Sequence, residues 1–127
     1  DVSAWDIERE NPLYLPQSKV YTGCCALGPL LVTTDELANP YDLLLACTII
    51  RDGQSRFRGE ASTARLHRKF ENLVEYLLRA NQVPAGSVLL TGTGIIVTED
   101  AALAAGDRVT ISSPAIGELS NPAVMVG

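Results

Sequence analysis

The pattern of apolar and polar positions predicts one amphipathic helix in the second half of the chain. Apolar residues recur at helical spacing between positions 66 and 78, with charged and amide side chains between them. Thr63 is a candidate N-cap, and Asn81 followed by Pro84 is a stop signal. We therefore expect a helix from about Thr63 to Ala80. Its apolar stripe consists of Leu66, Phe70, Leu73, Val74, Leu77 and Leu78.

The rest of the chain has the pattern of short strands. The longest apolar run, Leu43 to Ile50, predicts a strand ending at Arg51, and the turn signal Asp52-Gly53 joins it to a second strand at 55–59. A helical turn is expected at 6–11, and a loop at 12–26. The pattern predicts an α+β fold that is rich in β-strand and has one main helix. Further short strands are expected at 30–33, 87–91, 108–112, 116–119 and 123–126.

Composition and charge exclude several classes of function. With 127 residues the chain forms a single domain at most. A net charge of -5 without a basic stripe argues against a nucleic-acid partner, and the longest apolar run is too short to span a membrane. Three cysteines without metal-ligand spacing, Cys24, Cys25 and Cys47, indicate buried thiols in a reducing compartment. We therefore expect a cytoplasmic protein.

Carboxylates and one lysine gather in the first nineteen residues. Asp1, Asp6, Glu8 and Glu10 can include a ligand for a divalent cation, although an acidic cluster is more often a solvated face. Lys19 can stabilise a developing negative charge, although a lone lysine is usually exposed. On the residues alone, both alternatives stay open.

A second candidate is the segment Thr91-Gly92-Thr93-Gly94, which follows an expected strand. Small residues let backbone amides and threonine hydroxyls approach a carboxylate or phosphate. A structural turn is the alternative, because no Lys-Ser/Thr pair follows to make a phosphate-binding loop. His67, the one histidine, is expected on the surface of the helix.

Several motifs, taken in order, resemble the C-terminal half of the fumarylacetoacetate hydrolase superfamily. The segments DIERENPLYLPQSK and LLTGTGII are especially similar to the branch of 2-keto-3-deoxy sugar-acid dehydratases that act on pentonates such as arabinonate and xylonate. The ordered set spans nearly the whole chain, which makes it specific. Its members are DVSAWDIE, QSKVY, CALGP, the hairpin with Asp52-Gly53, VLLTGTG, GDRVTI and IGELSNP.

The resemblance implies a mixed β-sheet rolled around the site, and a homodimer. It implies Mg2+ as the cofactor, with Mn2+ or Ca2+ as alternatives, held by three carboxylates. Asp1 matches one of these ligands. The other two form a Glu-x-Glu pair upstream of the position of Asp1, outside these 127 residues. Residues 1–127 are therefore expected to be the C-terminal part of a single catalytic domain.

The resemblance also assigns roles to individual residues. Lys19 matches the family lysine beside the metal and the substrate oxygens, and is the catalytic candidate. Thr93 matches the threonine that contacts the substrate carboxylate, with Thr91 and Gly92 beside it. Glu8 is a further substrate-binding candidate. The His-Glu dyad that activates water in the hydrolases belongs to the absent upstream part.

Three positions depart from the family pattern. Trp5 stands where family members commonly have an arginine linked to substrate binding, which puts recognition of an anionic substrate in question. Glu8 stands where hydrolases often have glutamine, and this favours the dehydratase branch. Gly23 stands where many hydrolases have a threonine.

The function implied by the resemblance is dehydration of a 2-keto-3-deoxy sugar acid through an enolate stabilised by the metal and Lys19. The first alternative is hydrolysis of a C–C bond in a fumarylacetoacetate-like β-diketo acid. The second is a non-catalytic interaction domain or an inactive fragment. In the enzymatic interpretations, the partner is a small 2-oxo acid.

Overall fold

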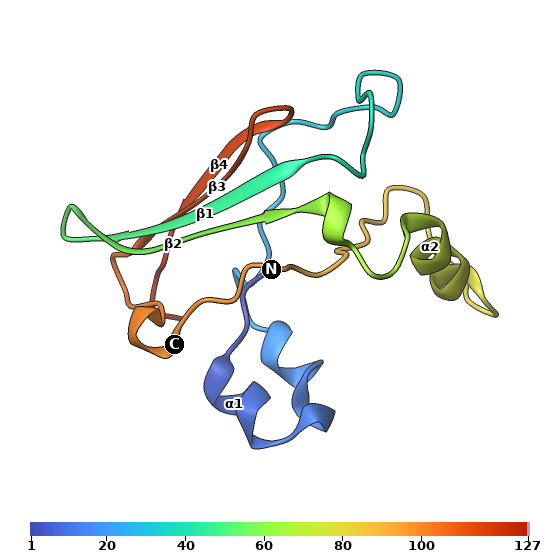
Figure 1. Ribbon diagram of the computed structural model, residues 1–127. Coiled ribbons are helices and arrows are strands. Elements are labelled where there is room, and N and C mark those ends of the chain that lie inside the picture. Colours follow the sequence, from blue (N-terminus) through green and yellow to red (C-terminus); the bar gives the residue numbers. More distant parts are fainter. Residues whose placement is uncertain (127) are drawn as a thin grey trace.

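A four-stranded antiparallel sheet forms the centre of the computed structural model, which describes residues 1–126 (Figure 1). The sheet has the order β2-β1-β3-β4, and its pairings are antiparallel, so the described residues contain no parallel pair of the mixed sheet that the resemblance implied. The predicted α+β class, rich in β-strand and with one main helix, is confirmed. The strands are β1 (Leu44–Arg51), β2 (Gln54–Ser62), β3 (Arg108–Ser113) and β4 (Gly117–Pro122).

Short helices lie outside the sheet. The first α-helix, α1, follows the first four residues, and α2 lies beyond the end of β2 rather than across a sheet face (Figure 1). No residue of α2 is buried. The α-helices are α1 (Trp5–Glu10) and α2 (Phe70–Leu78), and the 3-10 helices are η1 (Pro12–Tyr14), η2 (Gln17–Lys19), η3 (Thr63–Arg65) and η4 (Glu99–Ala101).

One face of the sheet is apolar and holds a small core. The register aligns Cys47 with Ile111 and Ile49 with Val109, so these side chains share that face. Ile49 is 1% exposed and Cys47 is 8% exposed, whereas Ile111 on the neighbouring strand is 42% exposed. The core of the described residues is therefore centred on β1.

A buried ion pair fixes the loop before β3 to the end of β1. Nε and Nη2 of Arg51 each donate to the Asp107 carboxylate at 2.7 Å. The same Nη2 donates to the Ala102 carbonyl, and the Ala104 amide donates to Asp107. Asp107 has no exposed surface. Hydrogen bonding from Arg51 lowers the pKa of Asp107 to about 2.

The predicted hairpin is present, and its second strand is longer than expected. Asp52 and Gly53 both adopt positive φ, as a tight hairpin turn requires. Pairing with β1 continues to the Leu44–Ser62 pair, past the expected end at position 59. Side-chain pattern alone missed this extension because Glu60 and Ser62 are polar residues on a paired strand.

The main helix, α2, begins at Phe70, so Leu66, the first residue of the predicted apolar stripe, lies before the helix. Thr63 does not cap it, because its hydroxyl accepts a hydrogen bond from the Leu43 amide at 2.9 Å. The α-helix starts where the Phe70 amide donates to the Tyr41 hydroxyl, also at 2.9 Å. It ends at Leu78. The first part of the predicted helix is therefore η3 followed by a non-helical connection, and His67 lies exposed in that connection.

Three predicted strands, at 30–33, 87–91 and 123–126, are not strands in the described residues. Each is apolar, as predicted, but none joins the sheet as a strand. In the third, Ala123 accepts a hydrogen bond from the Gly106 amide and donates one to the Asp107 carbonyl, and the pairing does not extend into a strand. A strand requires hydrogen bonds to a neighbour, which an apolar pattern does not guarantee. Their side chains are largely open to solvent, and Leu31 is 92% exposed.

The accessible surface is large for a chain of this mass. It amounts to 9511 Å². A monomer of 13.6 kDa is expected to expose about 6,600 Å², which leaves an excess of roughly 2,900 Å². A standard protein–protein interface removes about 800 Å² from each partner. The open surface is therefore larger than one such interface covers.

Candidate functional site

Asp1 and Lys19 lie together, as their positions in the family motifs predicted. The Lys19 ammonium is 3.0 Å from Oδ2 of Asp1. It also donates to the Ser3 hydroxyl at 2.8 Å. Both charged side chains are about one-third exposed, at 33% for Lys19 and 32% for Asp1. A carboxylate, an ammonium and a hydroxyl thus meet at a surface that solvent reaches.

Backbone hydrogen bonds hold this cluster in place. The Val2 amide donates to the Cys24 carbonyl at 2.8 Å, and the Ala4 amide donates to the Ser18 carbonyl at 2.9 Å. The first residues therefore run beside the segment that carries Lys19. Ser18 has no exposed surface, and its hydroxyl donates to the Leu15 carbonyl. This buried serine anchors η2, so Lys19 extends from a fixed backbone.

Glu8 lies on α1, one helical turn after Ala4. Its amide donates to the Ala4 carbonyl at 3.0 Å, which ties α1 to the segment carrying Asp1. Its carboxylate oxygen Oε2 is buried and has no hydrogen-bond partner among the described residues. Buried carboxylate oxygens usually have a partner, so this unpartnered oxygen is an exception among the described residues.

The segment from Thr91 to Gly94, the 91–94 turn below, is exposed and irregular, with a bend at Gly94. Gly92 has a φ of 85°, a left-handed conformation that favours glycine. The Thr93 hydroxyl oxygen accepts a hydrogen bond from the Ile95 amide at 3.0 Å. Its proton remains free to be donated to an anion. The geometry thus combines the structural turn and the open hydroxyl that the sequence left as alternatives.

Gly59 of β2 allows this turn to approach the sheet. A Cβ atom at Gly59 would lie 2.8 Å from Cγ2 of Ile95 and 2.8 Å from Cζ of Phe57. The Ile95 side chain therefore occupies the space that any other residue at position 59 would fill. This contact places Thr93, two positions earlier, beside β2.

Some predicted site residues are not joined to the cluster. Within residues 1–126 no hydrogen bond or ion pair links Glu8 or the 91–94 turn to Asp1 or Lys19. Asp6 and Glu10 are exposed on α1. The roles of Thr91, Gly92, Thr93 and Glu8 in substrate binding therefore stay predictions.

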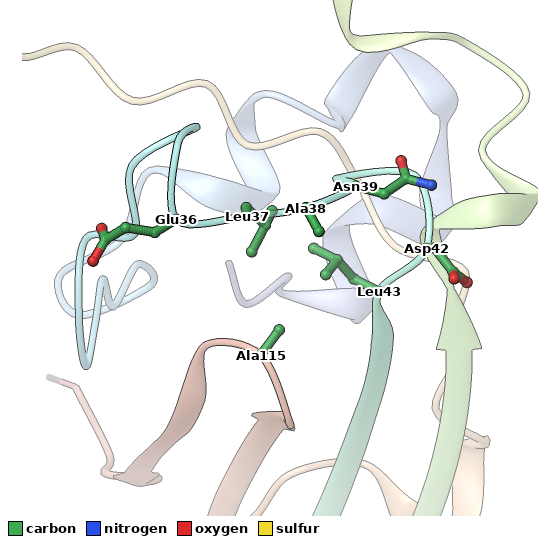
Figure 2. Close-up of a pocket in the computed structure, with 7 residues that line it drawn as sticks. All are labelled: Glu36, Leu37, Ala38, Asn39, Asp42, Leu43 and Ala115. Atoms are coloured by element: carbon green, nitrogen blue, oxygen red, sulfur yellow. The ribbon is translucent and has the colours of Figure 1, made fainter.

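An open depression of about 370 Å³ lies elsewhere, between the 36–43 loop and the β3–β4 turn (Figure 2). Leu37, Leu43 and Ala115 face one another across it, whereas the Glu36 carboxylate points away. Thr33 holds that carboxylate through its amide and its hydroxyl. No predicted site residue lines this depression, so it is not the expected site.

The described residues do not form a metal site by themselves. No group of three or more His, Cys, Asp or Glu side chains in residues 1–126 could hold a metal ion. Asp1 is the one carboxylate that the family motif matches.

In this same part of the chain, no helix has the length and apolar character needed to cross a bilayer.

Sequence reasoning missed two residues that shape the site. Ser3 bonds Lys19, and its place in the DVS motif beside Asp1 was a signal that could have identified it. Gly59 has no such signal, because a glycine in a strand does not reveal which distant side chain lies over it.

Comparison with known proteins settles the family. The protein-family model described as fumarylacetoacetate hydrolase, C-terminal, matches residues 1–124 of the sequence. The chain belongs to the fumarylacetoacetate hydrolase family. This confirms the resemblance drawn from the ordered motifs.

The similar proteins in this family include two sugar-acid dehydratases. The 2-dehydro-3-deoxy-D-arabinonate dehydratase of Saccharolobus solfataricus is 49% identical over 122 residues, covering 96% of this chain and 41% of that protein. A probable 2-keto-3-deoxyxylonate dehydratase of Haloferax volcanii is 43% identical over 126 residues, covering 99% of this chain and 44% of that protein. The chain spans less than half the length of these relatives.

A solved structure shares the fold. It is 2-keto-3-deoxy-D-arabinonate dehydratase in complex with magnesium and 2,5-dioxopentanoate, with a TM-score of 0.93 and 48% sequence identity. The match covers 96% of this chain and 43% of that one. The expected fumarylacetoacetate hydrolase fold is thereby confirmed for this chain.

Proposed function

We propose that this chain is part of an enzyme that dehydrates a 2-keto-3-deoxy pentonate. The observation that carries the proposal is the 49% identity, over 96% of the chain, to a 2-dehydro-3-deoxy-D-arabinonate dehydratase. The 2,5-dioxopentanoate in the similar structure differs from a 2-keto-3-deoxy pentonate by one water, as a dehydration product must. Hydrolysis of a β-diketo acid is less well supported, because the two relatives described above are named as dehydratases.

Lys19 is the proposed catalytic residue. Removal of a proton from C3 of a 2-keto acid places negative charge on the 2-oxo oxygen. The Lys19 ammonium, which the Ser3 hydroxyl and the Asp1 carboxylate hold at the surface, can stabilise that charge. The C4 hydroxyl then takes up a proton and leaves as water, which gives a 3,4-unsaturated 2-keto acid. Proton shifts that convert its C5 alcohol to an aldehyde are needed to reach 2,5-dioxopentanoate.

The remaining site residues are proposed to bind the substrate. The Thr93 hydroxyl has a proton free to donate to the substrate carboxylate, and the turn at Thr91 and Gly92 leaves backbone amides exposed beside it. Glu8 is proposed to bind a substrate hydroxyl through its carboxylate, one oxygen of which has no partner among the described residues.

Mg2+ is the proposed cofactor of the whole enzyme, as in the similar structure. The residues of this chain do not fit the ion alone, because Mg2+ requires near-octahedral oxygen ligation and Asp1 supplies one carboxylate. We propose that a Glu-x-Glu pair in polypeptide outside these 127 residues supplies the other protein ligands. The roughly 2,900 Å² of excess surface supports this, since further polypeptide of the same domain would cover it. We also propose that the complete protein is a homodimer.

The test compares this chain with a full-length parent protein that contains it. We expect the parent to bind Mg2+ in isothermal titration and to dehydrate a 2-keto-3-deoxy pentonate, and we expect Lys19→Met to abolish turnover. This chain alone should bind Mg2+ weakly and show no turnover. Cleavage of a β-diketo acid by the parent, without dehydration, would favour the hydrolase alternative. An inactive parent would favour a non-catalytic domain.

A further inference from the structure

Residues 88–91, the 88–91 segment, combine large apolar side chains with backbone groups that lack a partner. Val88, Leu89 and Leu90 are 59%, 39% and 44% exposed. Within residues 1–126, the amides and carbonyls of this segment make no backbone hydrogen bond. The chain that returns here from α2 toward the sheet contains no strand (Figure 1). The described residues therefore neither cover the 88–91 segment fully nor pair with it.

The segment has the sequence pattern of a strand that is buried on both faces. Successive side chains of an extended chain point to opposite faces, so three apolar residues in a row make both faces apolar. Gly86 and Gly92, with φ of 84° and 85°, bound a run that is too short for a stable helix. Burial of both faces would also remove the backbone from water, and its amides and carbonyls would then need hydrogen-bond partners. A neighbouring strand supplies such partners.

We propose that the 88–91 segment becomes a strand by pairing with a strand of polypeptide that lies outside these 127 residues in the same molecule. The chain covers 41% and 44% of the two dehydratases, so more than half of each relative lies outside the match. The excess surface of roughly 2,900 Å² gives that polypeptide an area to cover. A second copy meeting an outer surface would cover one face of the segment, whereas this run needs cover on both.

The pairing has a consequence for the 91–94 turn, which begins where the segment ends. On the far side of the turn, Ile95 packs against β2 at Gly59. A strand paired with the 88–91 segment would hold the near side. The Thr93 hydroxyl would then be positioned by β2 and by the added strand together. This inference does not depend on which reaction the parent protein catalyses.

The first test is amide hydrogen exchange of the full-length parent, followed by mass spectrometry. We expect the amides of the 88–91 segment to exchange at least about tenfold more slowly than in an unstructured peptide of the same sequence, as the amides of β1 do. Exchange at the unstructured rate, in a parent whose β1 amides are protected, would overturn the pairing.

The second test examines both faces of the segment. Leu89→Ala and Leu90→Ala shorten side chains that point to opposite faces of a strand, and we expect each to lower the urea midpoint of the parent. The control is Gln82→Ala, which shortens an exposed side chain in the same connection and should leave the midpoint unchanged. A loss at one leucine alone would show cover on a single face and would overturn the inference. So would no loss at either leucine, or an equal loss in the control.

The third test identifies the partner. The parent is prepared with the photo-cross-linking residue p-benzoylphenylalanine in place of Val88, and normal and heavy-isotope-labelled chains are refolded together. We expect cross-links to peptides outside these 127 residues that carry the same label as the 88–91 segment. Cross-links between differently labelled chains would assign the segment to a second copy and overturn the inference. Cross-links confined to these 127 residues would also overturn it.

Discussion

Replacing Gly59 by alanine tests how the sheet positions the 91–94 turn. The new Cβ would lie 2.8 Å from Cγ2 of Ile95 and from Cζ of Phe57. Carbon atoms pack best at about 3.5–4.0 Å, so these atoms must separate by roughly 0.7 Å or more. Overpacking of this kind costs about 1–3 kcal/mol. Because Gly59 is not in the left-handed region, the change adds a steric contact without backbone strain.

The assay is a urea melt of the full-length parent, together with KM for the 2-keto acid. We expect Gly59→Ala to lower the free energy of unfolding and to raise KM. The reason for the change in KM is that the Ile95 amide donates to the Thr93 hydroxyl, so displacement of Ile95 also moves Thr93. Removing the opposing side chain in Gly59→Ala/Ile95→Ala should make the combined stability loss smaller than the sum of the two single losses.

The control for stability is Gly94→Ala, whose Cβ would lie 3.4 Å from Cβ of Ala61 and therefore meets a milder contact. We expect a clearly smaller stability loss there than at Gly59. Strict additivity of Gly59→Ala and Ile95→Ala, or an unchanged melt in Gly59→Ala, would show that the two residues are not in contact.

Three further predictions follow from the buried ion pair, the helix and the turn. The pKa of Asp107 is lowered from 3.8 to about 2, so its ionised form stabilises the fold above about pH 4, and this contribution is lost as the pH falls toward 2. Acid titration followed by circular dichroism should show this loss in wild type, and Asp107→Asn should lack it; identical profiles would contradict the assignment. Leu73→Ala should cost less in this chain than the ~2–5 kcal/mol of a fully buried site, because Leu73 is only partly buried. Comparing denaturant melts of the chain and the parent checks this, and an equal loss in both would show that no further polypeptide covers α2. Thr93→Val should raise KM in the parent with little change in stability, and an unchanged KM would remove Thr93 from the substrate site.

Local signals in the sequence predicted much of the sheet. Asp52-Gly53 identified the hairpin because only a few residue types accept the backbone angles of that turn. The predictions of strands at 30–33 and 87–91 were wrong. Their apolar pattern reports a tendency to be buried, whereas a strand also needs a partner, and none is present among the described residues.

The start of the main helix depended on a contact that the sequence does not reveal. Thr63 has the chemistry of a cap, but its hydroxyl bonds the Leu43 amide, and the Tyr41 hydroxyl serves the first turn of α2 instead. Both contacts join residues far apart in the chain. A local capping signal cannot distinguish a free threonine from one already engaged.

The part of the candidate site that lies in the family motifs could be predicted from the sequence. The positions of Asp1 and Lys19 within two short motifs predicted their proximity, and the ion pair shows it. Ser3 could have been identified from its place in the DVS motif, whereas Gly59 contacts a residue far away in the chain and no motif indicates that contact. The buried Arg51–Asp107 pair was missed for the same reason.

The strand order β2-β1-β3-β4 has a kinetic consequence. β1 and β2 are joined by a two-residue turn and can pair within about 1–10 μs, whereas pairing of β1 with β3 must close a long loop. We therefore expect the β1–β2 hairpin to form before β3 joins it. The 91–94 turn lies inside the loop that this later step closes, so it reaches its place late. Refolding that slows on substitution in β3, but not in β2, would contradict this order.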